Sequence, residues 1–280
     1  MGKISAEAKQ QYFDRVKEYK AEVEQLIAWE KNVLQAVNKQ AEGAAYKRLN
    51  LAEERLNLAS RYLLLNRISL ALLGVKNEAF LNDSRKSCYQ CIIYLEEVTS
   101  DLIDAPFSEY EDRLEQIERY GIDKRYALIR KLGFTIDSVE ESFGENSKWK
   151  WSFVELEGRF ATVTKNMLNL KTLVAGLDPR ANYYEERYGH LNLAKQLLQR
   201  AADRYRERYE LSTLRLDDFK LAIEYLQALR RIQLLIGESD QAETVKKRIE
   251  VWKQKMDADD RREASSKTRS NAASTQTKSS

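Results

Sequence analysis

The feature that most constrains the fold of this chain is an alternating three- and four-residue spacing of apolar side chains from Leu49 to Gly74. An α-helix turns once per 3.6 residues, so this spacing places those side chains along one stripe. The pattern ends at Gly74, and a second apolar pattern begins at Ala79. We therefore predict a long helical hairpin. Its buried stripe would consist of Leu49, Ala52, Leu56, Ala59, Leu63, Asn66, Leu70 and Leu73.

A second seam of this kind runs along the first predicted helix, where apolar residues from Tyr12 to Val37 follow a heptad that is interrupted at Glu30. Phe13, Ile27 and Leu34 flank this seam and widen it. A wide stripe is typical of a helix that packs against more than one neighbour, rather than of a strict two-stranded coiled coil.

The composition extends the helical prediction to the whole chain. Its 280 residues include only 2 Pro and 10 Gly, and 32% of them are charged. Turns between strands consume Gly and Pro, so this composition favours long helices over a sheet. We predict an all-α protein whose long antiparallel hairpins form a bundle or an irregular α-solenoid. The net charge of +3 predicts no strong attraction to nucleic acid or to an anionic membrane.

Four glycines mark expected chain reversals: Gly74, Gly176, Gly237 and, with a looser pattern, Gly133. Glycine readily takes the left-handed conformation that closes a helix. The spacing from glycine to the next alanine resembles the turn within a tetratricopeptide hairpin. These turns do not recur at the fixed period of about 34 residues that such repeats have, so the resemblance concerns the turn alone. The pair at 178–179, Asp then Pro, predicts a new helix start.

These breaks suggest how the chain is divided. We expect N-terminal helical hairpins over 1–104, a connector of short helices over 105–148 and C-terminal helical hairpins over 149–258. One continuous helical unit over 1–258 is the alternative. Residues 259–280 are charged and then rich in Ser, Thr and Lys. Because they lack large apolar side chains, we predict a disordered tail.

Few residues carry the chemistry of an enzyme. Cys88 and Cys91 form the only CxxC pair, and His190 is the only histidine. A structural zinc site needs four such ligands, and redox pairs of this kind usually follow a strand. We therefore expect buried thiols and a histidine that packs between helices or lies at the surface. No phosphate-binding glycine loop or nucleophile elbow is present. We predict no catalytic, cofactor-binding or metal-binding residues, although an enzyme that uses carboxylates alone stays open.

Aromatic and basic residues supply the candidate binding sites. Trp149 and Trp151 stand about 200° apart on a helix, so one of them should be exposed, and exposed tryptophan is enriched at binding hot spots. The Arg/Tyr-rich helix over 183–215 could stack on bases or bind an acidic peptide, or it could be a solvated face beside a core face. The candidate partner-binding residues are Trp149, Trp151, Tyr183, Arg187, Arg204 and Arg208.

The function that these patterns favour is a non-enzymatic scaffold or adaptor that binds another protein or a second copy of itself. The alternatives are a helical protein that binds membrane surfaces or membrane curvature, and a nucleic-acid binder acting through the helix over 183–215. The first residues form no apolar leader, so we expect a cytoplasmic protein.

Overall fold

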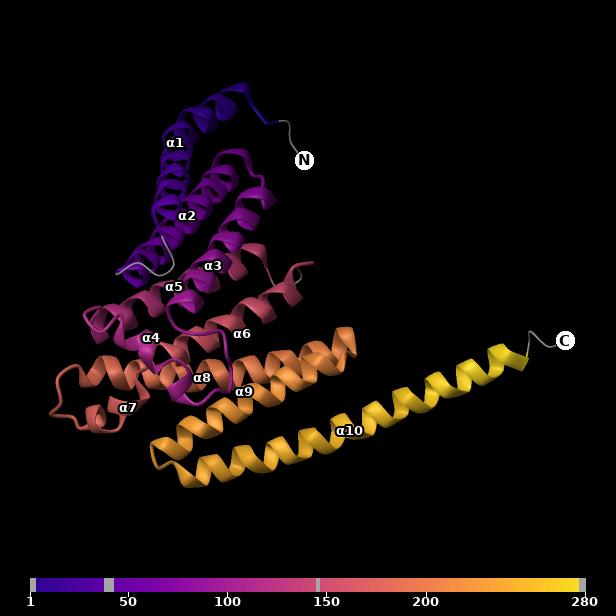
Figure 1. Ribbon diagram of the computed structural model, residues 1–280. Helices are drawn as coiled ribbons and strands as arrows, with labels where there is room; N and C mark the ends of the chain where they lie inside the picture. Colours follow the sequence, from indigo (N-terminus) through magenta and orange to yellow (C-terminus); the bar gives the residue numbers. More distant parts are fainter. Residues whose placement is uncertain (1–3, 38–42, 145–146, 277–280) are drawn as a thin grey trace. The chain divides into compact units, whose positions relative to one another are not determined.

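The computed structural model describes residues 4–37, 43–144 and 147–276, with side chains up to residue 262. All regular structure in these residues is helical, which confirms the predicted all-α class. In chain order (Figure 1) the helices are α1 (Ala6–Ala36), α2 (Ala44–Leu73), α3 (Glu78–Val98), the 3-10 turn η1 (Phe107–Glu109), α4 (Glu111–Glu115), α5 (Ile122–Phe143), α6 (Lys150–Asn166), α7 (Leu170–Leu173), the 3-10 turn η2 (Ala175–Leu177), α8 (Tyr184–Arg208), the π-helical turn η3 (Tyr209–Thr213), α9 (Leu216–Leu235) and α10 (Ser239–Gln276).

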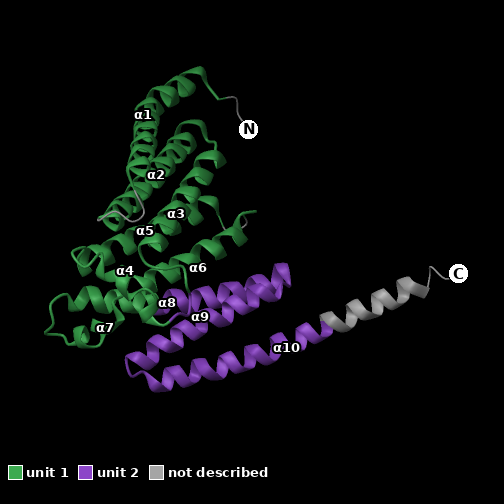
Figure 2. Ribbon diagram, in the orientation of Figure 1, with its two compact units in different colours: residues 1–102, 106–194 green, residues 103–105, 195–280 purple. Residues whose placement is uncertain are grey.

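The chain forms two compact units, which Figure 2 distinguishes by colour. The first contains residues 1–102 and 106–194, and the second contains residues 103–105 and 195–280. The division falls within α8 and not at the predicted connector of short helices. The reason lies in α5, the long helix of that connector, which packs against α2, α3 and α6 of the first unit.

The predicted hairpin is formed by α2 and α3. Gly74 ends α2 in the left-handed conformation, with φ of 64°. The buried Asn66 accepts a hydrogen bond at 2.8 Å from the backbone N–H of Asn77, the residue that caps α3. Leu70 is 53% exposed, contrary to the prediction, whereas Leu72 and Leu73 beyond it are partly buried against the core. The rest of the stripe up to that point is buried: Leu49, Ala52, Leu56, Ala59 and Leu63.

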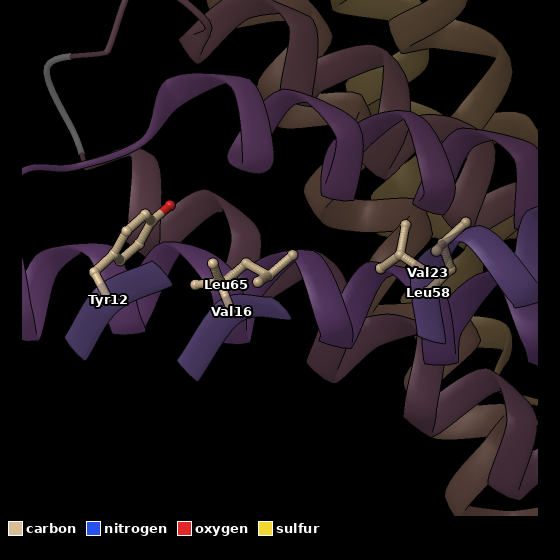
Figure 3. Packing of buried hydrophobic residues seen from close by; sticks show 5 residues of the cluster. All are labelled: Tyr12, Val16, Val23, Leu58 and Leu65. Carbon is tan, nitrogen blue, oxygen red and sulfur yellow. The ribbon is translucent and has the colours of Figure 1, made fainter. Parts of the chain in front are cut away.

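Helix α1 packs along α2 through the predicted seam. Figure 3 shows Tyr12, Val16 and Val23 aligned on one side of α1, facing Leu58 and Leu65 of α2. All five side chains are buried in one cluster. The heptad spacing is the cause, since it keeps this side of α1 turned toward the same neighbour over many turns.

Glu30, which interrupts the apolar seam of α1, is itself buried at 6% exposure. Its carboxylate accepts hydrogen bonds from Arg55 of α2 and from the hydroxyl of Tyr94 of α3, each at 2.6 Å. Burial and the bond to Glu30 raise the pKa of Tyr94 to about 12. A buried charge is tolerated when it is paired and hydrogen-bonded, and here the partners come from two other helices.

Two of the four predicted glycine reversals are wrong. Gly237 is left-handed like Gly74, with φ of 80°, but α5 runs without interruption through Gly133. A Cβ at Gly133 would lie 3.0 Å from Phe160 of α6. Glycine is therefore needed there so that two helices can approach closely, not to end a helix. Gly176 is buried in η2, and the side chain of Arg187 occupies the space that its Cβ would need.

The start of α8 also differs from the prediction. Asp178 does not cap a helix; its carboxylate accepts from the backbone N–H of Arg180 at 2.9 Å, in an exposed turn. Tyr183 then takes a left-handed conformation with φ of 61°. Only after this residue does the chain become helical, at Tyr184.

Most of the predicted tail belongs to α10. This helix runs past residue 259, where we expected a tail to begin, and reaches Gln276. Residues 277–280 of the predicted tail lie outside the described residues. The side of α10 that packs inward ends before this region; its buried residues are Ala242, Val245, Ile249 and Trp252. Among the residues that the structure describes, no helix has the length and apolarity required to cross a bilayer.

Candidate functional site

The least regular backbone of the second unit lies where α8 ends. Tyr209–Thr213 forms a π-helical turn, and the next residue, Leu214, is left-handed with φ of 50°. The N–H of Leu214 donates to the carbonyl oxygen of Tyr209 at 3.0 Å and closes the turn. A leucine in this conformation costs on the order of 1 kcal/mol, and both π-helical turns and backbone strain concentrate at functional sites. We call residues 208–220 the α8–α9 corner and take it as the candidate site.

The buried carboxylate of Asp218 binds two residues of the corner, Arg208 and Thr213. Asp218, on the first turn of α9, forms an ion pair with Arg208, and both side chains are nearly buried. The Thr213 hydroxyl donates to the same carboxylate at 2.5 Å. The ring of Tyr209 stacks on Phe219 with a centroid distance of 4.9 Å. These contacts hold the strained turn in place, since each of them joins η3 or the end of α8 to α9.

The corner presents apolar side chains to solvent beside an open groove. Leu211 is 69% exposed and Leu214 is 68% exposed, although leucine gains free energy by leaving water. The groove has a volume of about 1040 Å³ and combines residues of the corner with residues of α10. It is lined by Tyr209, Glu210, Thr213, Leu214, Arg215, Leu216, Asp217, Lys220, Lys255, Asp259 and Arg262.

Charged residues of both signs line the groove. Lys255 of α10 lies 3.4 Å from Glu210 and 3.8 Å from Asp259. The hydroxyl of Tyr209 donates to Asp259 at 2.9 Å. Within the described residues, the exposed guanidinium of Arg215 has no ion-pair partner. The groove therefore offers an apolar edge, a polar floor and one cation that can pair with an incoming carboxylate.

Of the six predicted site residues, only Arg208 belongs to the corner, and its role there is to pair with Asp218. Arg204 lies one turn earlier in α8, on a shallow hollow of about 400 Å³ formed by polar side chains of that helix. Tyr205 of the same helix and Tyr209 of η3 are buried; Tyr205 stacks on Tyr225 with a centroid distance of 5.5 Å. The structure thus fits the reading of a solvated face beside a core face.

Tyr183 and Arg187 lie at the start of α8, in the first unit. The left-handed Tyr183 is 52% exposed. The Arg187 side chain is half-buried over Gly176, and it lines a cavity of about 30 Å³ together with Arg125 and His190. A cavity of this size holds about one water molecule, which makes it too small for an organic ligand.

Trp149 and Trp151 lie at the start of α6, and both are half-buried. We expected one of them to be exposed, but basic side chains cover both rings. The guanidinium of Arg85 lies 4.5 Å from the ring of Trp149, and Lys150 lies 4.9 Å from the ring of Trp151. The predicted residues therefore occupy three separate places and do not form one site.

Sequence reasoning missed Leu211 and Leu214. The segment Leu211–Leu216 contains no Gly or Pro, so the sequence does not mark a strained reversal there. The usable signal was that Leu211 and Leu214 belong neither to the buried stripe of α8 nor to that of α9. Leucines that no helix buries, at a reversal without glycine, indicate an exposed and strained corner.

The cysteines and the histidine are buried, as expected of groups that pack rather than react. Cys88 and Cys91 are free thiols with no exposure, and burial raises the pKa of Cys88 to about 12. His190 lies 2.8 Å from the carbonyl oxygen of Thr164, and burial lowers its pKa to about 4. In the part of the chain that the structure describes, no group of three or more His, Cys, Asp or Glu side chains is placed to hold a metal ion.

Comparison with known proteins places the chain in a family without transferring a function. No curated protein matches it. A model of the TP0443 family matches residues 8–260, which covers α2 to α9 completely and nearly all of α1. Because the match extends over both compact units, the chain belongs to the TP0443 family.

Proposed function

We propose that this protein is a non-enzymatic helical scaffold that binds another protein at the α8–α9 corner. The observation that carries the proposal is the strained reversal at Leu214, which holds two leucines in solvent beside an open groove. Both the backbone conformation and the exposure are unfavourable in the free protein. A partner that covers Leu211 and Leu214 would recover the free energy of burial.

The chemistry of the corner fits a protein–protein contact. Interfaces commonly have an apolar centre that excludes water and a polar rim. Here the exposed leucines supply the centre, and Arg215, Lys220 and Lys255 stand around the groove with the acidic residues between them. We infer that the partner contributes an apolar side chain to the leucines and a carboxylate to Arg215.

The nucleic-acid alternative receives less support, because two arginines at the end of α8 already have carboxylate partners. Arg206 lies 3.0 Å from Glu210, and Arg208 pairs with Asp218. Tyr205 and Tyr209, the two rings that stand among these arginines, are buried, although Tyr183 and Tyr188 near the start of the helix are exposed. We retain the cytoplasm as the proposed location, which suits a protein with two free thiols, since cytosolic thiols stay reduced.

Site-specific photo-crosslinking in cells that express the protein tests the proposal. A benzophenone amino acid at position 214 is expected to give a discrete crosslinked polypeptide. The matched control is position 234 on α9, where the native leucine is 50% exposed but does not line the groove. No adduct at position 214, or the same adducts at both positions, would contradict the proposed site.

A binding measurement with the partner protein, identified by the crosslink and then purified by itself, completes the test. Replacing Leu211 and Leu214 by serine should weaken binding at least about tenfold, because it removes the centre of the contact. Leu234→Ser should leave the dissociation constant unchanged. Since both leucines are exposed, circular dichroism and the melting temperature should show that each variant is folded.

A further inference from the structure

The outer side of α1 carries a second apolar stripe, which none of the described residues covers. Phe13 is 59% exposed, Ile27 is 43% exposed and Leu34 is 45% exposed. These residues occupy one heptad position and adjoin the seam that Val16 and Val23 bury against α2, whose residues Figure 3 labels. The sequence predicted that these residues widen the seam for a second neighbour. In the described part of the chain that side is open to solvent.

Four lysines lie on the same side of α1: Lys9, Lys17, Lys20 and Lys31. One acidic residue, Glu24, lies among them on the helix surface. Within the described residues no ion pair involves any of these lysines, and all of them are exposed. The outer stripe of α1 therefore comprises Phe13, Ile27 and Leu34 with Lys9, Lys17, Lys20 and Lys31.

We propose that the outer stripe docks an acidic amphipathic helix of a partner protein. Side chains that repeat every seven residues make a straight seam along a helix, and a straight seam fits one other helix. The lysines beside the seam match carboxylates at the flanking positions of that helix. Charge complementarity of this kind selects the partner and speeds association.

Two other occupants fit the outer stripe less well. A second copy would bring lysines against lysines, because the stripe carries several cations and only Glu24 as an anion. A membrane surface calls for a wide apolar face, and here the three large apolar side chains form a narrow line. Vesicle binding is therefore treated as a contrary outcome of the test.

This inference goes beyond the corner and does not depend on it. The outer stripe lies in the first unit, and the α8–α9 corner lies in the second. A chain with both surfaces would hold two different proteins at once, which is what a scaffold does. Because the two sites share no residue, variants of one leave the other intact, and either proposal can fail alone.

The test uses the full-length protein and two synthetic helical peptides of about four heptads, each labelled for fluorescence anisotropy. Both peptides carry leucine along one seam; the first has glutamate at the flanking positions and the second has lysine. The glutamate peptide should bind, with an affinity that falls as salt is added, because screening weakens exposed charge pairs. Lys17→Glu with Lys20→Glu should weaken this binding at least about tenfold and improve binding of the lysine peptide.

Controls separate docking from general charge and from loss of fold. Arg15 is exposed on α1 away from the stripe, so Arg15→Glu should change the affinity for the glutamate peptide less than about twofold. Phe13→Ser with Ile27→Ser should lower that affinity while the melting temperature stays close to that of the native protein. Failure of the glutamate peptide to bind, equal binding of both peptides, or sedimentation with phosphatidylserine vesicles in place of peptide binding would overturn the proposal.

Discussion

Acidification to about pH 5 should destabilise this protein through one residue, His190. The imidazole is 2% exposed and stacks on Tyr126 with a centroid distance of 5.8 Å. Its Nε2 lies 2.8 Å from the carbonyl oxygen of Thr164. Burial is the main cause of its lowered pKa, which falls from 6.5 to about 4, and the nearby Arg125 acts in the same direction.

The sign and size of the effect follow from these two pKa values. Above pH 6.5 the residue is neutral in both the folded and the unfolded chain, so its contribution to stability is fully present. As the pH falls toward 4, only the unfolded chain takes up the proton, and stability is lost. At about 1.4 kcal/mol for each pKa unit, the complete loss is about 3 kcal/mol, and about 2 kcal/mol of it has occurred at pH 5.

Urea unfolding of the native protein and of His190→Gln, at about pH 7 and about pH 5, measures this contribution. The glutamine variant loses the ring contacts, which should lower its stability at about pH 7, but it cannot titrate. The native protein should therefore lose about 2 kcal/mol more than the variant between the two pH values. Equal losses in the two proteins would refute the assignment of a neutral, buried His190.

Three further predictions concern stability and reactivity. Glu30→Gln should lower the unfolding free energy by about 2 kcal/mol, because Arg55 then keeps a partly buried charge without its partner. Tyr94→Phe removes only one hydrogen bond and should lower the unfolding free energy by about 1 kcal/mol. Chemical denaturation of both variants measures the two values. Leu214→Gly relieves the left-handed strain, so calorimetry should show an unchanged or higher melting temperature, while binding of the partner at the corner weakens. A clear drop in the melting temperature would count against strain at this residue. The thiols of Cys88 and Cys91 should react with a disulfide reagent only after unfolding, since burial raises their pKa values, and rapid labelling of the native protein would show that they are accessible.

Local spacing was enough to predict much of the fold. The stripe from Leu49 to Leu63 is buried, and Gly74 closes α2 as expected, because both features depend on periodicity and backbone conformation alone. Gly133 and Gly176 were wrongly predicted to end helices, because sequence spacing does not show which groups pack against a glycine. Glycine serves both to end helices and to let other groups approach, and only the packed structure shows Phe160 against one and Arg187 against the other.

The candidate site was harder to predict, because the roles of its residues depend on partners distant in the sequence. Arg208 was predicted to bind a partner because arginine is common at binding sites. Its side chain instead pairs with Asp218 of the next helix and stabilises the corner. Trp149 suggested an exposed contact, but Arg85 of α3 lies over its ring. Leu211 and Leu214 carried no signal by type, since leucine is common in helices, and their exposure follows from the shape of the reversal.

The buried carboxylate of Glu30 also fixes the position of α1 along its own axis. An apolar seam alone would allow α1 to slide by one turn, about 5.4 Å, because similar side chains would replace one another in the contact. Such a slide would carry the carboxylate away from Arg55 and Tyr94 and leave its charge without these partners. Glu30 therefore fixes the axial register of α1 against α2 and α3. A partner helix that packs on Phe13 and Ile27 would find these side chains at one defined position along the hairpin.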